Sequence, residues 1–370
     1  MRTGVLRACF AVLVGLAGAM LATTPSARGA AGANSARDGA QRAYASEWWR
    51  LTGHLRTRDG RRFAVAATFF RFSAGPRLGG ARRSAWADDE FYPATFAVVD
   101  ERERRYRSAT RLERGAFGFG RALAGRLDVA AGPWSLRAVR SPDATGQIFE
   151  LRAGDRAVTL ALRQVALKPR VVFGVGGVVK SGSCARCVEH AEAYTRLRAR
   201  GTLSIDGTAY AVAGTTWLDH EYGSHVLDPG DRGWDRFAIQ LEDGRDVLVR
   251  IVRRADGTPS PASSGEVVAR DGTLTNLGSH DVAVVNVAKT DWHSRASGAT
   301  YPVLWQLFVP KANLNLAVVP PFSAQEIVSD QGGPAYYEGS VDVERAPPPG
   351  GDPGAGFVEL TGYRRPLAHL

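Results

Sequence analysis

The sequence feature that most constrains the fold is a set of five Asp-Gly pairs, each between two stretches that alternate apolar and polar residues. Asp-Gly is a preferred connection of tight β-hairpins, because both positions tolerate positive φ angles. The pairs lie at 59–60, 206–207, 243–244, 256–257 and 271–272. No segment after residue 30 carries helical periodicity beyond two or three turns. This pattern predicts an all-β chain folded as barrels or sandwiches.

The N-terminus has the pattern of a secretory signal peptide. Arg2 and Arg7 form a positive start, residues 8–22 are apolar and uncharged, and small residues follow at 26–31. The apolar run is shorter than a membrane-spanning helix requires. We therefore expect residues 1–30 to be removed and the mature protein to be periplasmic or secreted.

Loss of this segment would lower the formal net charge from +10 to +7. The remaining arginines are dispersed along the chain, with doublets at 61–62, 82–83 and 253–254. Dispersed charge is typical of a solvated surface, whereas nucleic-acid binding needs a clustered basic patch. We expect no nucleic-acid partner. The sequence also carries no nucleotide, flavin or haem signature, and we expect no cofactor.

The mature chain of about 340 residues exceeds the usual size of a single core, so two domains are the default. We predict a flexible lead-in at 31–43, an N-terminal domain at 44–223 and a C-terminal domain at 224–366.

Cys184 and Cys187 are the two cysteines of the mature chain. In an oxidising compartment this spacing favours a local disulfide. A thioredoxin-like motif would need a surrounding βαβ pattern, and c-type haem attachment would need histidine where Val188 stands. A metal site with His190 would lack a fourth ligand.

The richest chemistry lies in the segment 214–224, at the end of a predicted strand. Period-two geometry places Trp217, Asp219 and Glu221 on one face. The same face continues upstream through small side chains, namely Ala209, Ala211, Ala213 and Thr215. Such a face suits a barrel interior that keeps open volume, and we expect any chemistry there.

His220, Glu221 and His225 resemble part of a zinc-protease motif, but the second histidine is five residues on rather than four. On a helix this would splay the ligands about 140° apart, and Gly223 disfavours a helix. We expect no metal. The acidic run 88–90 lacks the spaced ligands of a calcium loop and is expected to face local arginines or a pocket rim.

Several short motifs follow one another along the chain in a characteristic order and spacing. They are Glu47-Trp-Trp49, Thr68-Phe-Phe-Arg71, Phe91-Tyr-Pro-Ala94, Gly214-x-x-Trp217-Leu-Asp-His-Glu221, Gly233-Trp-Asp235, Trp292-x-Ser294, Tyr337-Glu-Gly339 and Gly356-Phe-Val-Glu-Leu-Thr-Gly-Tyr363. Together they resemble the AttH-like branch of the carotenoid 1,2-hydratase (hydroxyneurosporene synthase) family over almost the whole mature chain.

The resemblance implies two tandem lipocalin-like β-barrel domains with a deep apolar pocket. It also implies kinship with enzymes that add water to a terminal isoprenoid double bond. Genes of AttH-like relatives commonly lie beside those of ABC exporters. We read Glu47-Trp48-Trp49 as a motif that closes a barrel, with exposure of its rings to a ligand as the alternative.

The resemblance aligns the hydratases' acid with Asp219, in an aromatic-x-Asp motif whose aromatic is usually tyrosine and is Trp217 here. A His-x-Trp pair of the hydratases aligns with His190-Ala-Glu192, so the tryptophan is replaced. These departures favour binding over carotenoid hydration. Because Asp219 and His190 are retained, an enzymatic function remains an alternative.

Alkene hydration needs an acid held neutral by an apolar wall and aromatic faces that stabilise a carbocation. Asp219 is the candidate acid, with His190 or Glu221 positioning the water. The alternative is that Asp219 and Glu221 only pair with arginine, such as Arg236. The candidate ligand-binding aromatics are Trp217, Tyr222, Trp234 and Trp305.

We therefore predict an exported protein that binds an apolar isoprenoid or lipid ligand, in carriage or export beside an ABC transporter or a membrane. The first alternative is a hydro-lyase resembling carotenoid 1,2-hydratase, with Asp219 as general acid. The second is an interaction protein without a small ligand.

Overall fold

The computed structural model describes residues 38–73, 89–140, 146–184, 187–223, 227–287, 289–329 and 333–367. The expected signal peptide at 1–30 and most of the lead-in lie outside these residues, as do Asp88, His225 and the arginine doublet at 82–83. Within the described part of the chain, no helix is long and apolar enough to cross a membrane.

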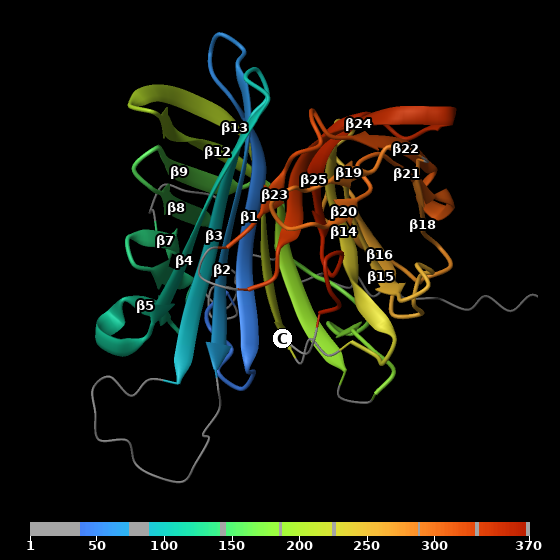
Figure 1. Cartoon of the computed structure of the whole chain (residues 1–370), viewed down its shortest axis with the longest axis horizontal. Helices are drawn as coiled ribbons and strands as arrows, with labels where there is room; N and C mark the ends of the chain where they lie inside the picture. The colour runs from blue at the N-terminus through green and yellow to red at the C-terminus, as the bar shows by residue number, and fades with distance from the viewer. Residues whose placement is uncertain are drawn as a thin grey trace, which may run out of the picture.

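Two large antiparallel sheets form most of the molecule and lie side by side along its long axis (Figure 1). The predicted all-β class with two lipocalin-like barrel domains is confirmed. All five Asp-Gly pairs connect antiparallel strands, and their glycines have positive φ angles, +89° at both Gly60 and Gly244. Glycine adopts this conformation without strain because it has no Cβ atom.

The first sheet runs in the order β4-β3-β2-β1-β13-β12-β9-β8-β7-β6-β5. It curls until its edge strands β4 and β5 come into contact, which makes a nearly closed barrel. Its strands are β1 (Ser46–Arg56), β2 (Arg62–Ser73), β3 (Glu90–Asp100), β4 (Arg105–Arg114), β5 (Gly120–Ala122), β6 (Asp128–Ala131), β7 (Trp134–Val139), β8 (Ile148–Gly154), β9 (Val158–Ala166), β10 (Val171–Val172), β11 (Val179–Lys180), β12 (Val188–Ile205) and β13 (Thr208–Gly223). A 3₁₀ turn, η1 (Ala116–Gly118), follows β4.

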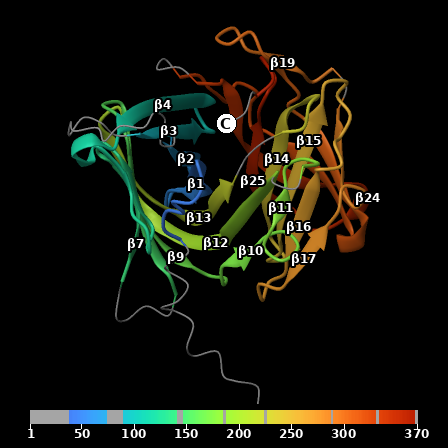
Figure 2. The same ribbon diagram turned by 90° about the horizontal axis from the view of Figure 1, so that it is seen from below.

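The second sheet runs in the order β17-β16-β15-β14-β25-β24-β22-β21-β18 and curves around its own core (Figure 2). Its strands are β14 (Asp231–Leu241), β15 (Asp246–Arg254), β16 (Ser264–Val268), β17 (Leu274–Leu277), β18 (Ala283–Asn286), β21 (Trp305–Val309), β22 (Leu314–Val319), β23 (Glu326–Ile327), β24 (Tyr336–Gly350) and β25 (Gly354–Leu360). A separate two-stranded sheet consists of β19 (Trp292–His293) and β20 (Thr300–Tyr301), and the 3₁₀ turn η2 (Pro310–Ala312) follows β21.

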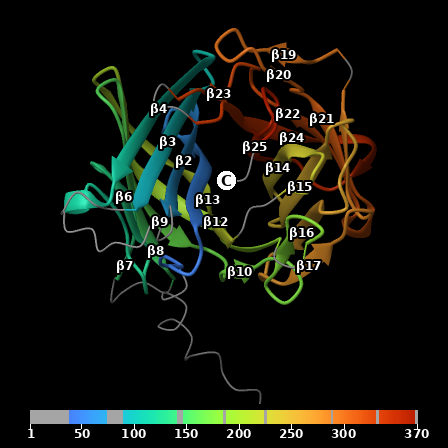
Figure 3. The same cartoon turned by 60° about the horizontal axis from the view of Figure 1, so that its bottom comes forward.

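The barrels meet through the outer faces of β1, β2, β12 and β13 on one side and of β14, β15, β24 and β25 on the other (Figure 3). Two apolar patches cover part of this interface. One is formed by Trp217, Ala238 and Leu248 with their neighbours, and the other by Ala66, Ile327 and Phe357 with theirs.

A buried charged group, the Asp246 cluster (Lys168, Thr195, Arg196 and Asp246), also joins the barrels. The Asp246 carboxylate accepts hydrogen bonds from Lys168 Nζ at 2.6 Å, Thr195 Oγ1 at 2.7 Å and Arg196 Nη2 at 2.6 Å. A β-bulge between Tyr194 and Leu197 interrupts the register of β12 at this point. The extra residue lets Thr195 and Arg196 both reach the second barrel.

Candidate functional site

A cleft of about 330 Å³ lies between the two barrels. The first barrel contributes outward-facing residues of β1 to β4, and the second contributes residues from β14, β23 to β25 and the C-terminal segment. The wall is largely apolar, with the aromatic side chains Trp48, Phe70, Phe72, Trp234 and Tyr336. Arg50 and Glu359 are the charged residues at its inner end, where a second small cavity adjoins it, and Arg111 of β4 is a third charged lining residue. An apolar cavity with a few convergent polar groups is the usual form of a small-molecule site.

Strand alternation explains why β1 supplies both core and cleft residues. Trp49 and Leu51 point into the core of the first barrel, and Trp48 and Arg50 point outward into the cleft. Each of the two interpretations of the motif Glu47-Trp48-Trp49, closure of a barrel and exposure of its rings to a ligand, therefore applies to one of its tryptophans. Trp49 stacks on His220 inside the barrel, with ring centroids 4.8 Å apart, and Trp48 presents its ring to the cleft.

Behind the inner end of the cleft lies a second buried charged group, the Arg50 cluster. It contains three arginines and six acids, namely Arg50, Arg236, Arg250, Glu189, Asp219, Glu221, Glu266, Glu338 and Glu359. Arg50 pairs with Glu359 and lies 3.5 Å from Asp219 and 3.6 Å from Glu338. A water-sized cavity beside the cleft is lined by the same Trp48, Arg50, Trp234 and Glu359, so the cleft and the cluster adjoin.

The sheet register assembles this cluster. Glu338, Glu359, Arg236 and Arg250 are direct cross-strand neighbours on β24, β25, β14 and β15. Like charges directly opposite each other are unfavourable, so the Glu338–Glu359 pair depends on Arg50 from the other barrel. Docking of the two barrels therefore completes the cluster.

Several carboxyl groups of the cluster hold protons unusually tightly. Burial raises the pKa of Asp219 to about 7, against the opposing effect of Arg50 and a hydrogen bond from Trp217. Burial likewise raises the pKa of Glu221 to about 7, helped by the charge of Asp219, and that of Glu338 to about 8. The pKa of Glu266 is raised to about 7, also by burial. Groups of this kind can exchange protons near neutral pH.

Hydrogen bonding within the cluster is incomplete. Among the described residues, neither carboxyl oxygen of the buried Glu338 has a hydrogen-bond partner, and Nε and Nη2 of Arg50 also have none. Asp219 Oδ2 lies 2.6 Å from Arg236 Nη2, but the alignment is that of an ion pair and not of a hydrogen bond. Buried polar groups are normally satisfied, and exceptions are concentrated at functional sites.

The face of β13 that was predicted to line a barrel interior lies elsewhere in the structure. Trp217, Asp219 and Glu221 do share a face, but it is the outer face of the first barrel, covered by the second barrel. The inner face carries Leu218. The expectation of a barrel interior is therefore wrong. Upstream on the same face, Ala209, Ala211 and Ala213 are exposed and Thr215 is half-buried, and the last two of these residues line a polar groove between the barrels. The alternative pairing of Asp219 and Glu221 with Arg236 is present.

His190 lies on the opposite side of the sheet from Asp219. Its cross-strand partner is Tyr222, and the two rings stack with centroids 5.1 Å apart. His190 Nδ1 lies 2.8 Å from the carbonyl oxygen of Gly177. The structure thus brings Asp219 and Glu221 together but keeps His190 and Tyr222 away from them.

Of the other predicted aromatics, Trp234 lines the cleft and its Nε1 donates to Glu359 Oε1 at 2.6 Å. Trp217 is buried between the barrels, and its Nε1 donates to Asp219 Oδ1 at 2.6 Å. Trp305 is buried in the core of the second barrel, where it packs on Phe237.

Sequence reasoning missed Arg50, Glu338 and Glu359 as site residues. All three stand at outward positions of long apolar strands, where a charged residue is costly unless it is paired. Glu338 and Glu359 also belong to the motifs on which the family resemblance rests. Charged residues inside such strands are the signal that could have identified them.

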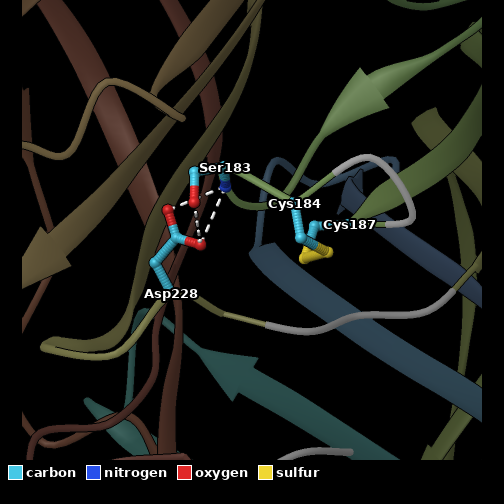
Figure 4. The surroundings of a disulfide bond; sticks show 4 residues. All are labelled: Ser183, Cys184, Cys187 and Asp228. Carbon is cyan, nitrogen blue, oxygen red and sulfur yellow. Dashed lines mark hydrogen bonds between the residues drawn. A yellow bond between two sulfur atoms is a disulfide. The ribbon is translucent and has the colours of Figure 1, made fainter.

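Cys184 and Cys187 form a disulfide, with the sulfur atoms 2.11 Å apart (Figure 4). Next to it, the Asp228 carboxylate accepts hydrogen bonds from the backbone N–H of Ser183 at 2.8 Å and from its hydroxyl at 3.0 Å. This contact ties the disulfide loop to the segment that leads into β14. Among the described residues, no group of three or more His, Cys, Asp or Glu is arranged to hold a metal ion.

Comparison with known proteins gives a consistent result. A sequence profile of the family described as AttH-like matches residues 34–363. A crystal structure designated AttH, from Nitrosomonas europaea, is 26% identical, with a TM-score of 0.76 over 89% of this chain and 96% of the other. Kievitone hydratase from Nectria haematococca has the same fold, with a TM-score of 0.62 at 15% identity over 85% of this chain and 88% of the other. No curated protein matches the sequence.

Proposed function

Because the chain belongs to the AttH-like family, we propose that it binds an apolar or amphipathic small molecule, an isoprenoid or a lipid, in the cleft between its barrels. The observation that carries the proposal is the cleft itself, which holds about 330 Å³ behind a largely apolar and aromatic wall. Burial of an apolar ligand surface there would be favourable by about 25 cal/mol per Å² before the costs of association.

The role that we propose for this binding is carriage of the ligand outside the cytoplasm, beside an ABC transporter or at a membrane. The signal-peptide pattern of residues 1–30 supports export. A carrier needs a site that shields an apolar molecule from water, and the position of the cleft between two rigid barrels meets that need.

The test is native mass spectrometry of the mature protein purified from the compartment to which it is exported, with extraction of any lipid that co-purifies. We expect a bound apolar molecule that is lost in the Phe70→Ala variant, since Phe70 lines the cleft. Phe117→Ala is the matched control, because Phe117 is an exposed phenylalanine outside the cleft. A wild-type protein that carries no molecule and binds none from a lipid and isoprenoid panel would refute the proposal.

A second candidate function is hydration of a terminal carbon–carbon double bond, and the raised pKa of Asp219 specifically favours it. The Asp219 carboxyl would give its proton to the terminal carbon, leaving a tertiary carbocation that water attacks. The oxonium formed then returns one proton to the carboxylate. Aromatic faces such as Trp217 and Trp234 would stabilise the cation by about 1–2 kcal/mol each.

An assay with unsaturated isoprenoids would decide whether this reaction occurs. We expect the wild type to form the tertiary alcohol and Asp219→Asn to lower the rate at least 100-fold. His190→Asn is the comparison, because His190 faces the other side of the sheet. Equal activity of the wild type and Asp219→Asn would exclude Asp219 as the acid.

A further inference from the structure

The buried charges behind the inner end of the cleft are unbalanced, and this imbalance determines which kind of ligand head group fits there. Six acids and three arginines make up the Arg50 cluster, so full ionisation would leave three negative charges in excess. Burying uncompensated charge is costly, and an excess must be neutralised by protons or by a cation. Without ligand, protons fill that role, as the raised pKa values of Asp219, Glu221, Glu266 and Glu338 indicate.

The side chains at the boundary between cleft and cluster suit a cation. Trp48 and Trp234 line both cavities, and the Trp234 indole is held by its hydrogen bond to Glu359. Indole is the aromatic ring that binds ammonium groups best, and the attraction grows when water is excluded. Glu359 stands at the same place as a carboxylate that can face the bound cation.

The two arginines that line the cleft do not create an opposite preference, and Arg111 lies 3.5 Å from Glu113. Arg50 lies within ion-pair distance of Asp219, Glu338 and Glu359, so its single charge is already opposed by three acids. With an anionic head group present, the cluster would have to take up still more protons to stay neutral, whereas a cation replaces protons that the cluster already holds. The electrostatic balance therefore disfavours carboxylate or phosphate.

We propose that the cleft selects an amphiphile with a cationic, ammonium-type head group, which sits between Trp48 and Trp234 beside Glu359 with its apolar tail along Phe70, Phe72 and Tyr336. This inference rests on the proposed function, because it concerns the same cleft. It adds the chemical class of the ligand, which the binding proposal leaves open.

Three probes built on a ten-carbon chain test the proposal, each used below its micelle concentration. They are decyltrimethylammonium, decanol and decanoate, with affinities measured by titration calorimetry at pH 7.5. We expect the cation to bind at least tenfold more tightly than decanol, and decanoate more weakly than decanol. Repeating the titrations in buffers of different ionisation enthalpy should show proton release only with the cation. The proton can come from the titratable and charged groups around the head-group position, namely Arg50, Arg236, Arg250, Tyr106, Tyr336, Glu189, Asp219, Glu221, Glu266, Glu338 and Glu359.

Two variants locate the effect. Glu359→Gln keeps an acceptor for Trp234 and should weaken binding of the cation about tenfold while leaving decanol unchanged. Glu338→Gln, whose side chain is buried without hydrogen bonds, should act in the same direction. Glu101→Gln is the control, because it removes the same charge from a polar groove elsewhere between the barrels.

The outcomes separate the two proposals. Decanol binding as tightly as the cation, or a cation affinity that Glu359→Gln and Glu338→Gln leave unchanged, would overturn the head-group inference and leave the cleft as a binding site. Tighter binding of decanoate would also overturn it. Failure of all three probes would refute both this inference and the proposed function.

Discussion

The Asp246 cluster and the Arg50 cluster both join the barrels through buried charges, but they differ in completeness. In the Asp246 cluster, one carboxylate meets Lys168 and Arg196 and accepts a further hydrogen bond from Thr195. In the Arg50 cluster, acids outnumber arginines, and both oxygens of Glu338 lack hydrogen bonds to the part of the chain that the structure describes.

The difference shows how a structural contact can be distinguished from a binding site. A buried cluster whose hydrogen bonds are satisfied, and which adjoins a polar groove through Arg196, fixes the orientation of the two barrels. An unsatisfied, acid-rich cluster beside an apolar cleft keeps polar groups available for a ligand. The first cluster should therefore dominate stability, and the second should dominate binding and pH dependence.

The largest expected effect belongs to Asp246→Ala. Removing this carboxylate leaves Lys168 and Arg196 as buried charges without their acid. Breaking a buried pair from one side typically costs about 3–5 kcal/mol. Chemical denaturation should show that loss in the free energy of unfolding. Asp246→Asn keeps an oxygen for Thr195 and should cost less, and a loss below about 1 kcal/mol for alanine would contradict the assignment.

The second prediction concerns the pH dependence of stability at Glu338. Its pKa is about 8 when folded and near 4.5 when unfolded, so the unfolded chain releases the proton first. Stability should therefore fall as pH rises from about 4.5 to 8, because the unfolded state binds fewer protons in that window. The groups that face Glu338 are Arg50, Glu359, Tyr106 and Tyr336.

Glu338→Gln should remove much of this dependence and make the protein about 2–4 kcal/mol more stable than the wild type at pH 8. Denaturation curves at pH 5, 6.5 and 8 would measure it. Glu344→Gln, on the same strand but with an exposed side chain, serves as the reference for loss of a negative charge elsewhere. Parallel stability curves for the wild type and Glu338→Gln would show that Glu338 does not carry a raised pKa.

The sequence predicted the fold well because its signals are local. Asp-Gly turns and strand alternation act over a few residues, and they specify hairpins whatever surrounds them. The same alternation correctly placed Trp217, Asp219 and Glu221 on one face. It could not say which side of the sheet that face covers, because two barrels in contact bury outward faces as well as inward ones.

The site was predicted only in part, since its members come from strands far apart in the chain. Arg50 on β1 meets Glu338 on β24 and Glu359 on β25, and no local pattern links them. Trp234 was found because it belongs to a recognisable motif, and the structure places it in the cleft. His190 was assigned beside Asp219 by alignment, but the register of β12 on β13 places it on the other face.

The smallest expected effect concerns an ion pair between the barrels that belongs to neither the Asp246 cluster nor the Arg50 cluster. Arg62 on β2 and Asp342 on β24 form an ion pair across the same interface, but both side chains are about one-third exposed. Solvent screens such a pair and its long side chains lose entropy. Asp342→Ala, which leaves the pair of Arg62 with Glu101 in place, should therefore cost less than about 1 kcal/mol in the free energy of unfolding. Denaturation at 0.05 and 0.5 M salt would measure the effect, which should shrink at high salt. A loss as large as that of Asp246→Ala would mean that barrel docking depends on the number of bridging charges, and not on how completely they are buried and paired.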